Sequence, residues 1–385
     1  MSAVVPLRRT RARQPAPRPA RLALLGNGGV GSAFVARYAR LAASGVVLPA
    51  VSWICNSRTQ ITGGVDLASA LRDACAAAPV RGGFPPWAEG ESPQPGDIVV
   101  DATASETVAD WHPEWLARGV HVVTANKLGT GGELGRAQAI ADARVATGSH
   151  YGDSATVGAG LPLLRSVRAL VDGGDRIHSI EGVLSGSLAW LFAHFDGTRP
   201  FSELVREARS AGYTEPDPRV DLSGEDVRRK LLILARAAGF ALSAHEVVVE
   251  SLVPDVLARV AAVDVETTLG TLDRALDARR ADAAAAGARL CVVGRFDADG
   301  ARVGLRALPA THPLCAGGGT DNRVAIHSDR YSAQPLVIQG PGAGAEVTAA
   351  ALLDDVLAIA HARPARAEQK GRAPDAGTRS MQAST

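Results

Sequence analysis

The sequence predicts an α/β fold in which a doubly wound parallel sheet is followed by a second, α+β domain. Two observations lead to this prediction. Short apolar runs alternate with helical patterns up to about residue 150, as in parallel sheets with helices on both faces. Beyond that point the alternation weakens, and longer helical patterns and one hairpin signal follow. We therefore expect a first domain at 21–150 and a second domain at 151–334.

The first domain opens with RLALLGNGGVGSAFVARYARLAASG (21–45), which reads as strand, glycine turn and helix. Phe34, Val35, Tyr38 and Leu41 give the helical spacing. The expected later elements are apolar runs at 48–58, 97–105 and 119–127, with helical stretches at 66–78 and 105–119. The turn-rich segment 79–97 is expected to be a surface loop.

The second domain is predicted to be richer in helix. Alternating apolar residues around an Asp-Gly turn at 290–314 indicate a hairpin. The segment 335–362 returns to strand, glycine turn and helix, and we expect it to complete the first domain. The expected helices of the second domain lie around 161–172, 188–195, 201–211 and 223–238.

Composition points to a globular protein that acts on small molecules. The 385 residues are 46% hydrophobic and 21% charged, and the formal net charge of +1 favours neither nucleic acid nor a membrane surface as a partner. No apolar run reaches the roughly 20 residues needed to span a bilayer. The four cysteines are far apart in sequence, which argues against zinc and disulfides and favours the cytoplasm.

Both ends of the chain are polar and aperiodic. Residues 1–20 are rich in Arg and Pro and lack the apolar stretch of a secretory signal, so we expect a disordered leader, with a transit peptide as the alternative. Residues 363–385 are expected to form a disordered tail.

A glycine-rich turn between the first strand and helix predicts a dinucleotide site. Gly26 allows the tight turn, Gly28 lets the backbone approach a pyrophosphate, and Gly31 permits close helix packing. Gly29 and Val30 complete the turn at the helix N-terminus, where anions bind. A chance glycine turn is the alternative interpretation.

The second strand bears on the choice between NAD and NADP. NAD sites usually place an acidic residue at its end, but this chain reads Cys-Asn-Ser-Arg-Thr at 55–59. Arg58 could neutralise a 2′-phosphate, which favours NADP, although a solvated surface arginine and NAD use stay open.

Polar residues follow the third and fourth strands, where a doubly wound sheet binds its ligand. Thr103 and Ser105 are candidates for donating hydrogen bonds to the cofactor or for capping the next helix. Lys127 is a candidate charge beside the nicotinamide and substrate, with a surface lysine as the alternative.

The segment GYTEPDPRVDLSGEDVRRK (212–230) gathers five acids before Lys230. Asp226 and Lys230 have the i,i+4 spacing of a routine surface ion pair, and Ser223 is a plausible helix N-cap. However, the helix becomes almost wholly apolar after Lys230, as expected of a buried helix. Its polar start is therefore expected to face a cleft.

Several motifs together resemble the homoserine dehydrogenase family. They are GNGGVG, HVVTANK, ATVGAGLP, LSGSL, GYTEPDPRVDLSGEDVRRK and IQGPGAGAEVTA, in this order over about 21–362. The resemblance implies a Rossmann-type domain and a second domain for substrate and dimerisation. It also implies NAD(P)-dependent interconversion of L-aspartate 4-semialdehyde and L-homoserine in threonine and methionine biosynthesis.

By the same resemblance, Lys230 is the catalytic lysine that gives a proton to the developing alkoxide. Glu215 and Asp226 hold the substrate's ammonium and hydroxyl groups. Gly186 and Ser187 line the pocket.

The resemblance also places Tyr213 beside the substrate pocket and Lys127 between cofactor and substrate. Thr103 and Gly344 are expected to contact the nicotinamide nucleotide.

The ATVGAGLP stretch resembles the family's monovalent cation loop. Backbone carbonyls of Val157, Ala159 and Leu161 are expected to bind Na⁺, but Ser154 replaces a glutamate that some members have there. The resemblance further implies a homodimer. We expect a monofunctional enzyme, without the aspartokinase or regulatory domains of some relatives.

Two other functions are compatible with the cofactor turn. A related oxidoreductase could act on another amino acid or hydroxy acid, which a substrate panel would distinguish. A nucleotide-binding regulator without chemistry is the second alternative, and the presence of Glu215, Asp226 and Lys230 argues against it.

Overall fold

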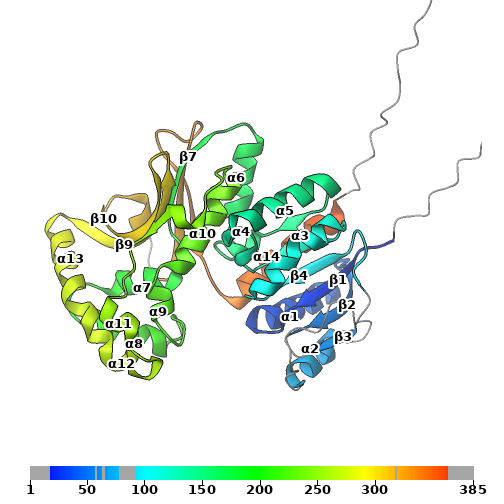
Figure 1. Cartoon of the computed structure of the whole chain (residues 1–385), viewed down its shortest axis with the longest axis horizontal. Coiled ribbons are helices and arrows are strands. Elements are labelled where there is room, and N and C mark those ends of the chain that lie inside the picture. Colours follow the sequence, from blue (N-terminus) through cyan, green and yellow to red (C-terminus); the bar gives the residue numbers. More distant parts are fainter. Residues whose placement is uncertain (1–17, 57–58, 63–65, 78–91, 317–318, 363–385) are drawn as a thin grey trace, which may run out of the picture.

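The computed structural model describes residues 18–56, 59–62, 66–77, 92–316 and 319–362. Two sheets organise them, each in its own half of the molecule (Figure 1). The expected leader and tail fall almost wholly outside these residues, as does most of the expected loop at 79–97.

The first sheet has the strand order β3-β2-β1-β4-β5-β6 and is parallel except for β3. The predicted doubly wound sheet is therefore confirmed. Its strands are β1 Arg21–Leu25, β2 Ala50–Cys55, β3 Gln60–Thr62, β4 Ile98–Asp101, β5 His121–Thr124 and β6 Tyr151–Gly152.

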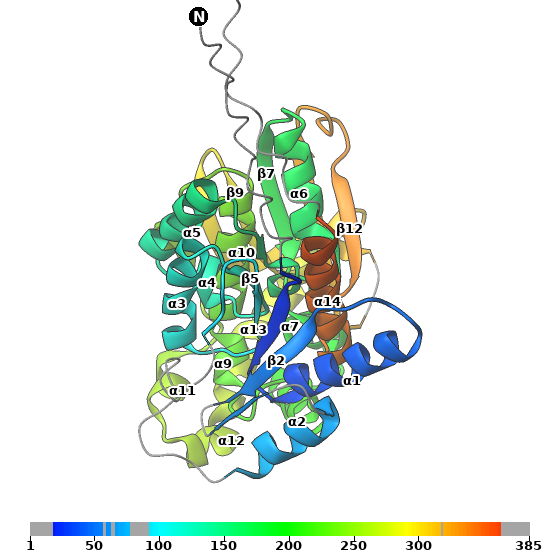
Figure 2. The same ribbon diagram turned by 90° about the vertical axis from the view of Figure 1, so that its right-hand side faces the viewer.

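Helices cover both faces of this sheet, because its central strands are buried on both sides. Figure 2 shows α1 and α14 on one side and α3 and α5 on the other. The helices of this half are α1 Gly29–Ala43, α2 Leu67–Ala76, α3 Glu106–Ala117, α4 Leu128–Gly131, α5 Leu134–Thr147 and the late helix α14 Ala345–His361.

The second sheet has the order β12-β11-β7-β9-β10-β8, and all its pairs are antiparallel except β8 with β10. The predicted hairpin is present as β9 and β10. The strands are β7 Ile177–Val183, β8 Val247–Val249, β9 Ala288–Asp297, β10 Gly300–Pro309, β11 Asp321–Ser328 and β12 Leu336–Pro341.

The late segment is divided between the two halves. Its helix α14 packs against α1, as expected, but its strand β12 pairs with β11 in the second sheet. The register joins Ile338 to Val324 and Leu336 to Ile326, and the side chains of Leu336 and Ile338 pack against the core of the second domain. The strand thus belongs with the second sheet rather than completing the first.

The long predicted helices of the second half are all present. They are α6 Leu163–Asp172, α7 Gly186–His194, α8 Phe201–Ser210 and α10 Glu225–Ala237. The long helix α13 Asp273–Ala285 was not predicted. Shorter elements join these helices: α9 Arg219–Leu222, α11 Asp255–Arg259, α12 Val265–Thr268, and the 3₁₀ turns η2 Ser154–Thr156, η3 Ala244–Glu246, η4 Ala262–Asp264, η5 Leu269–Leu272 and η6 Pro313–Cys315.

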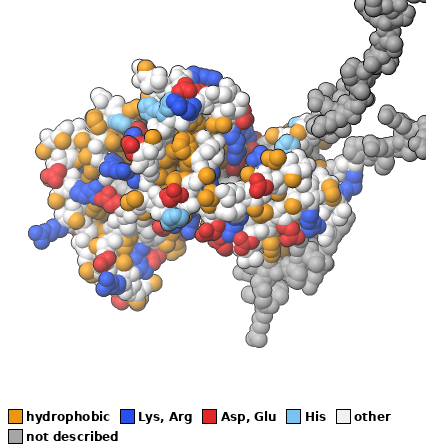
Figure 3. Space-filling view, turned by 45° about the horizontal axis from the view of Figure 1, so that its top comes forward, with side chains coloured by type: hydrophobic (Ala, Val, Ile, Leu, Met, Phe, Trp, Pro, Cys, Tyr) orange, Lys and Arg blue, Asp and Glu red, His pale blue; other side chains and the backbone are white. Residues whose placement is uncertain are grey.

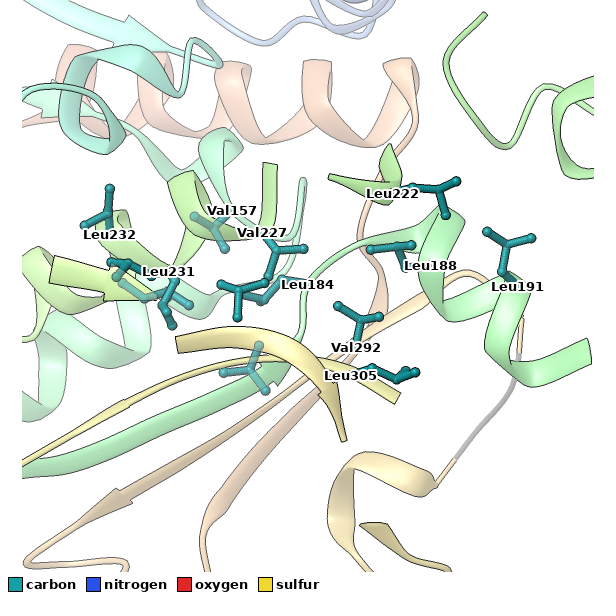
Figure 4. Packing of buried hydrophobic residues seen from close by; sticks show 14 of the residues in the cluster. Val157, Leu184, Leu188, Leu191, Leu222, Val227, Leu231, Leu232, Val292 and Leu305 are labelled. Carbon is teal, nitrogen blue, oxygen red and sulfur yellow. The ribbon is translucent and has the colours of Figure 1, made fainter. Parts of the chain in front are cut away.

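Helix α10 lies at the centre of the second core. Val227, Leu231 and Leu232 are at most 1% exposed, and Val227 and Leu231 lie beside Leu184 (Figure 4). The helix begins one residue later than Ser223 alone would predict, because Gly224 takes the N-cap with φ 79°. Burial of α10 on nearly all sides fixes the position of the polar residues at its start.

Acidic and basic side chains are intermixed on the face of the described residues shown in Figure 3, in keeping with the formal net charge of +1. In the described part of the chain, no helix has the length and apolar character needed to cross a membrane.

Candidate active site

A cleft of about 1380 Å³ lies between the two halves of the molecule. Both halves contribute predicted site residues to its walls. The lining includes Gly29, Val30, Thr103 and Lys127 from the first half, Gly186, Ser187, Tyr213, Glu215, Asp226 and Lys230 from the second, and Gly342 and Gly344 from the turn before α14.

The glycine turn has the geometry that a bound dinucleotide needs. Gly26 has φ 90°, and a Cβ there would lie 2.8 Å from the Ala102 oxygen. A Cβ on Gly31 would lie 2.0 Å from the Gly26 oxygen. Gly28, in contrast, has nothing within 4 Å, so its backbone is open to a ligand at the N-terminus of α1. These residues fit a pyrophosphate.

A buried network supports the next cofactor loop. The Asp101 carboxylate accepts a hydrogen bond of 2.8 Å from the Thr103 N–H. Its other oxygen lies 2.9 Å from His112 Nε2, and His112 Nδ1 lies 3.1 Å from the Tyr151 hydroxyl. Asp101 and His112 are both fully buried. The position of Thr103 is therefore fixed by polar groups within the first domain.

Ser105 has a different place from Thr103. Its hydroxyl accepts from the Val108 N–H at 3.4 Å and caps α3, and its carbonyl accepts from Asn126 Nδ2 at 2.9 Å. Ser105 is not among the described residues that line the cleft. Of the two roles considered for Ser105, the structure shows the helix cap.

Lys230, Asp226 and Lys127 form one charged cluster in the cleft. Lys230 Nζ lies 2.9 Å from one Asp226 carboxylate oxygen, and Lys127 Nζ lies 3.0 Å from the other. Lys230 Nζ also donates to the Leu184 carbonyl at 2.7 Å. Two lysines from different domains therefore meet on one carboxylate.

Burial and charge act on this cluster in opposite directions. Lys230 is 7% exposed, and burial lowers its pKa below the ordinary value of 10.5, although the Asp226 charge opposes the shift. Burial alone would raise the pKa of Asp226, but Lys230 and Lys127 hold it well below its usual range. Asp226 is thus ionised at neutral pH.

Glu215 is held in the cleft through its backbone. Its N–H donates to Asp221 Oδ2 at 2.8 Å, and Asp221 Oδ1 accepts from the Ser187 hydroxyl at 2.7 Å. Among the described residues, no hydrogen bond or ion pair engages the Glu215 carboxylate. That carboxylate is available to bind a cationic group.

The other acids of the segment have structural partners. Asp217 forms an ion pair of 2.6 Å with Arg219, whose guanidinium also donates to the carbonyls of Leu257 and Val260. Glu225 pairs with Arg228 on the first turn of α10. Both acids thus differ from Glu215, which has no such partner.

Tyr213 lies at the edge of the cleft. Its ring is 5.4 Å from that of Trp190, which in turn stacks on His194 at 4.2 Å. The side chain is 46% exposed, so one part of it packs on α7 while another part faces solvent.

The loop expected to bind a monovalent cation lies next to the cleft. Ala159 lines the cleft with φ 50°, a conformation that is uncommon outside glycine. The Leu161 carbonyl accepts from the Leu163 N–H at 2.8 Å, and the Val157 side chain is fully buried. Ser154 donates to Asp355 through its N–H and its hydroxyl, at 3.0 and 2.9 Å.

Arg58 falls outside the described residues. The neighbouring Asn56 is buried, with Nδ2 donating to the Ala74 carbonyl and Oδ1 accepting from the Thr59 N–H. Its side chain is therefore already engaged within the protein.

The sequence reasoning missed three contributions to the site. Asp221 links Glu215 to Ser187, and the Leu184 carbonyl binds the Lys230 ammonium. His112 supports the cofactor loop. The spacing of acids in 215–226 could have indicated Asp221, but a backbone carbonyl leaves no signal in side-chain patterns.

Comparison with known proteins places this arrangement in a family. The sequence model of homoserine dehydrogenase matches residues 162–357, and the model of the homoserine dehydrogenase NAD-binding domain matches residues 26–152. The homoserine dehydrogenase of Paracoccidioides brasiliensis is 35% identical over 366 residues, which cover 88% of this chain and 97% of that protein. The chain belongs to the homoserine dehydrogenase family.

Similarity extends to fused members of the homoserine dehydrogenase family. A bifunctional aspartokinase/homoserine dehydrogenase of Zea mays is 45% identical over 269 residues, or 69% of this chain. The match spans 29% of the maize protein. A hyperthermophilic archaeal homoserine dehydrogenase solved in complex with NADPH has the same fold, with a TM-score of 0.67, 20% identity, and coverage of 90% of this chain and 98% of that one.

Proposed function

We propose that this protein is an NAD(P)-dependent homoserine dehydrogenase, which interconverts L-aspartate 4-semialdehyde and L-homoserine in threonine and methionine biosynthesis. The observation that carries the proposal is the cluster of Lys230, Asp226 and Lys127 in a cleft that Gly29 and Val30 of the glycine turn also line. Family membership through both sequence models supports it.

Lys230 is proposed to transfer the proton. The bound nicotinamide supplies or accepts the hydride at the carbonyl carbon, and the oxygen needs a proton as the aldehyde becomes an alcohol. The buried ammonium of Lys230 gives that proton in reduction, and the neutral amine takes it back in oxidation. Asp226 and the Leu184 carbonyl orient Nζ for this transfer.

Glu215 and Asp226 are proposed to recognise the substrate. The free Glu215 carboxylate suits the ammonium group, and Asp226 suits the hydroxyl beside Lys230. Gly186, Ser187 and Tyr213 would form the wall around the amino acid.

The cofactor is proposed to lie along the first half of the cleft. Gly26, Gly28, Gly29, Val30 and Gly31 would hold its pyrophosphate. Thr103, Lys127 and Gly344 would contact its nicotinamide end, as they line the cleft beside Asp226. Ser105 would act through the position of α3.

NADP is the proposed preferred form. The chain has no acid at 55–59 to bind a ribose 2′-hydroxyl, and Arg58 could pair with a 2′-phosphate. The archaeal enzyme with the same fold was solved with NADPH. Arg58→Asp is expected to raise the KM for NADP and leave that for NAD much less changed; an unaltered NADP KM would contradict this role of Arg58.

A sodium ion is proposed at the carbonyls of Val157, Ala159 and Leu161. The left-handed backbone at Ala159 supports a loop shaped for such carbonyls. Cofactor affinity and thermal stability measured in NaCl and in choline chloride of equal ionic strength should differ if the site binds Na⁺. Equal cofactor affinity and equal thermal stability in both salts would contradict the proposed Na⁺ site.

The assembly is proposed to be a homodimer formed through the second domain, as the sequence resemblance implies. Val337 on the edge strand β12 is 40% exposed and points away from the core that Leu336 and Ile338 join. The cytoplasm is the proposed compartment, supported by four free cysteines.

Turnover of homoserine tests the main proposal. The full chain with L-homoserine and NADP or NAD should produce the absorbance of reduced nicotinamide. Lys230→Met should lower kcat/KM by roughly 10²- to 10⁴-fold, because the proton transfer is lost. The matched control Arg259→Met changes a cation that is 82% exposed and should keep full activity.

Calorimetric binding of NADPH to the Lys230→Met variant would show that its cofactor site is intact. If the unaltered chain turned over homoserine with neither cofactor, the proposed function would be wrong.

A further inference from the structure

A second cavity, of about 410 Å³, lies within the second domain and shares no lining residue with the cleft. It is formed by α7, α13, the first residues of β9 and the turn η6, all in the half of the molecule that holds the second sheet (Figure 1). Its size is within the range of small-molecule sites, roughly 300–1,000 Å³.

One part of the cavity is apolar. Phe192 of α7 and Phe195, the residue after the helix, contact each other edge to face, with ring centroids 6.4 Å apart. Leu290 and alanines of α7 and α13 extend this surface. Such walls favour a hydrocarbon or aromatic group over bulk water.

Arg323 brings a buried guanidinium group to the cavity. The residue is 5% exposed, and one terminal nitrogen donates to the Ala316 carbonyl. Within the described part of the chain, its Nε has no hydrogen-bond partner and no carboxylate forms an ion pair with the group. A buried charge without a counter-ion is costly, so an anion in the cavity would stabilise it.

Arg280 of α13 also lines the cavity. Its guanidinium lies over the Phe195 ring, 5.9 Å from the centroid, and packs closely against Gly197. Its Nε lies 4.0 Å from an Asp277 carboxylate oxygen, and one terminal nitrogen donates to the Asp196 carbonyl at 3.4 Å. These contacts hold the guanidinium in place beside the cavity.

Arg289 gives the cavity a third cation. It is exposed, and no hydrogen bond or ion pair engages it among the described residues. Asp196 is the acid in the described lining, and Asp277 lies beside Arg280. Three arginines therefore face two acids, and the charge around the cavity stays positive.

The Cys291 thiol of the lining does not supply negative charge. Cys291 and Cys315 both line the cavity, and burial raises the pKa of the Cys291 thiol to about 12. At neutral pH this thiol is uncharged and acts as part of the wall.

We propose that this cavity binds a small organic carboxylate with an apolar body. The carboxylate would accept hydrogen bonds from Arg323, Arg280 and Arg289, since guanidinium groups bind carboxylates through paired N–H donors. The apolar body would pack on Phe192 and Phe195. The inference does not depend on the proposed dehydrogenase activity.

The cavity is connected to the cleft through α7. Ser187, at the first turn of this helix, lines the cleft, whereas Phe192 and Phe195 at its other end line the cavity. The two sites lie at opposite ends of one helix, so a ligand in the cavity is not expected to compete with NADPH.

Calorimetry on the full chain, with phenylacetate as the probe, tests the site. The neutral analogue phenylacetamide has nearly the same shape and should bind at least about tenfold more weakly, which corresponds to about 1.4 kcal/mol. Saturating NADPH should leave the phenylacetate affinity unchanged. Equal affinity for the two probes, no heat from phenylacetate at millimolar concentration, or displacement by NADPH would overturn the proposal.

Three variants locate the binding. Arg323→Gln and Arg289→Ala should each weaken phenylacetate binding about tenfold, and Ala284→Trp should abolish it by filling the exposed mouth. Arg259→Ala, on α11 and 82% exposed, is the matched control and should bind normally.

Arg323→Gln loses the contact with the Ala316 carbonyl and could fail to fold. In that case the binding of phenylacetate to Arg289→Ala tests the site. Unchanged binding in both Arg289→Ala and Ala284→Trp would place the probe elsewhere and refute the site.

Discussion

Lys230 combines two conditions that rarely occur together in a lysine: it is 7% exposed, and it shares a carboxylate with a second lysine. Burial disfavours its charged form, whereas Asp226 favours that form. The first effect dominates, so the ammonium gives up its proton more readily than an ordinary lysine. That property is needed in a group that donates a proton in one direction and accepts it in the other.

The lowered pKa of Lys230 predicts opposite pH dependences for the two directions. Oxidation of homoserine needs the neutral amine, so its kcat/KM should rise with pH through a pKa below 10.5. Reduction needs the ammonium and should fall over the same range. Asp226→Asn removes the charge that raises this pKa, so the rising limb should move to lower pH.

Initial rates in both directions across the pH range, in buffers of constant ionic strength, would check this. In Asp226→Asn, the rise of kcat/KM with pH could instead occur at the same pH as in the unaltered chain, or at a higher pH. Either result would show that a group other than Lys230 controls the pH profile.

His112 is predicted to stabilise the first domain through Asp101 and Tyr151. His112→Phe removes the bonds of 2.9 and 3.1 Å, which weakens the support of the buried Asp101 carboxylate and takes away the described partner of the buried Tyr151 hydroxyl. The free energy of unfolding should fall by about 1–3 kcal/mol. Urea titration followed by circular dichroism measures it, and His245→Phe, at an exposed histidine, should change stability by less than about 0.5 kcal/mol.

The KM for the cofactor should also rise in His112→Phe, because Thr103 is bound to the same carboxylate. A variant with unchanged stability and unchanged KM would show that the network has no supporting role.

Among the structural elements, the turn between β12 and α14 contributes directly to the wall of the cleft. The turn between β12 and α14 places Gly342 and Gly344 in the lining. A Cβ on Gly342 would lie 1.9 Å from the Asn322 side-chain oxygen, and Asn322 is fully buried. The turn can therefore keep its course only without a side chain at that position.

Gly342→Ala is predicted to displace this turn. Because Asn322 cannot move into solvent, the backbone must shift away from it, and the KM for cofactor or substrate should rise at least about tenfold, equivalent to about 1.4 kcal/mol. Gly135→Ala is the control, since this helical glycine in α5 has nothing within 4 Å of its Cβ position.

The control should leave the KM values unchanged and could only gain helix stability, by roughly 0.5–1 kcal/mol. Steady-state kinetics of both variants decides the matter: equal KM values in Gly342→Ala and the unaltered chain would mean that the turn tolerates a side chain.

The whole molecule shows which features a sequence can predict. The doubly wound sheet followed from apolar runs and a glycine turn, because strand burial and φ 90° at Gly26 constrain residue type locally. The Lys230 and Asp226 pair followed from helical spacing. Contacts between distant segments did not follow, since the pairing of β12 with β11 and the bond of Asp101 to His112 depend on tertiary packing.

The proposed homodimer makes a prediction at this scale. Light scattering during size exclusion should give twice the chain mass of 39.7 kDa. Val337→Asp places a charge on the exposed apolar position of β12 and should shift the protein toward the monomer, whereas Val145→Asp, at a position in the first half that is also exposed, should not. A monomeric mass for the unaltered chain would exclude the homodimer.

Helix α10 touches both halves of the molecule. Its Arg236 donates to the carbonyls of Thr130 and Gly132 in the first half, and a Cβ on Gly131 would collide with the Arg229 carbonyl. These contacts begin at Arg229, next to Lys230, and extend to Arg236, less than two helical turns further along α10. If the two halves moved apart to open the cleft, residues near these contacts would be displaced least. Ligands could then enter and leave the cleft while Lys230 kept nearly the same position relative to the nucleotide.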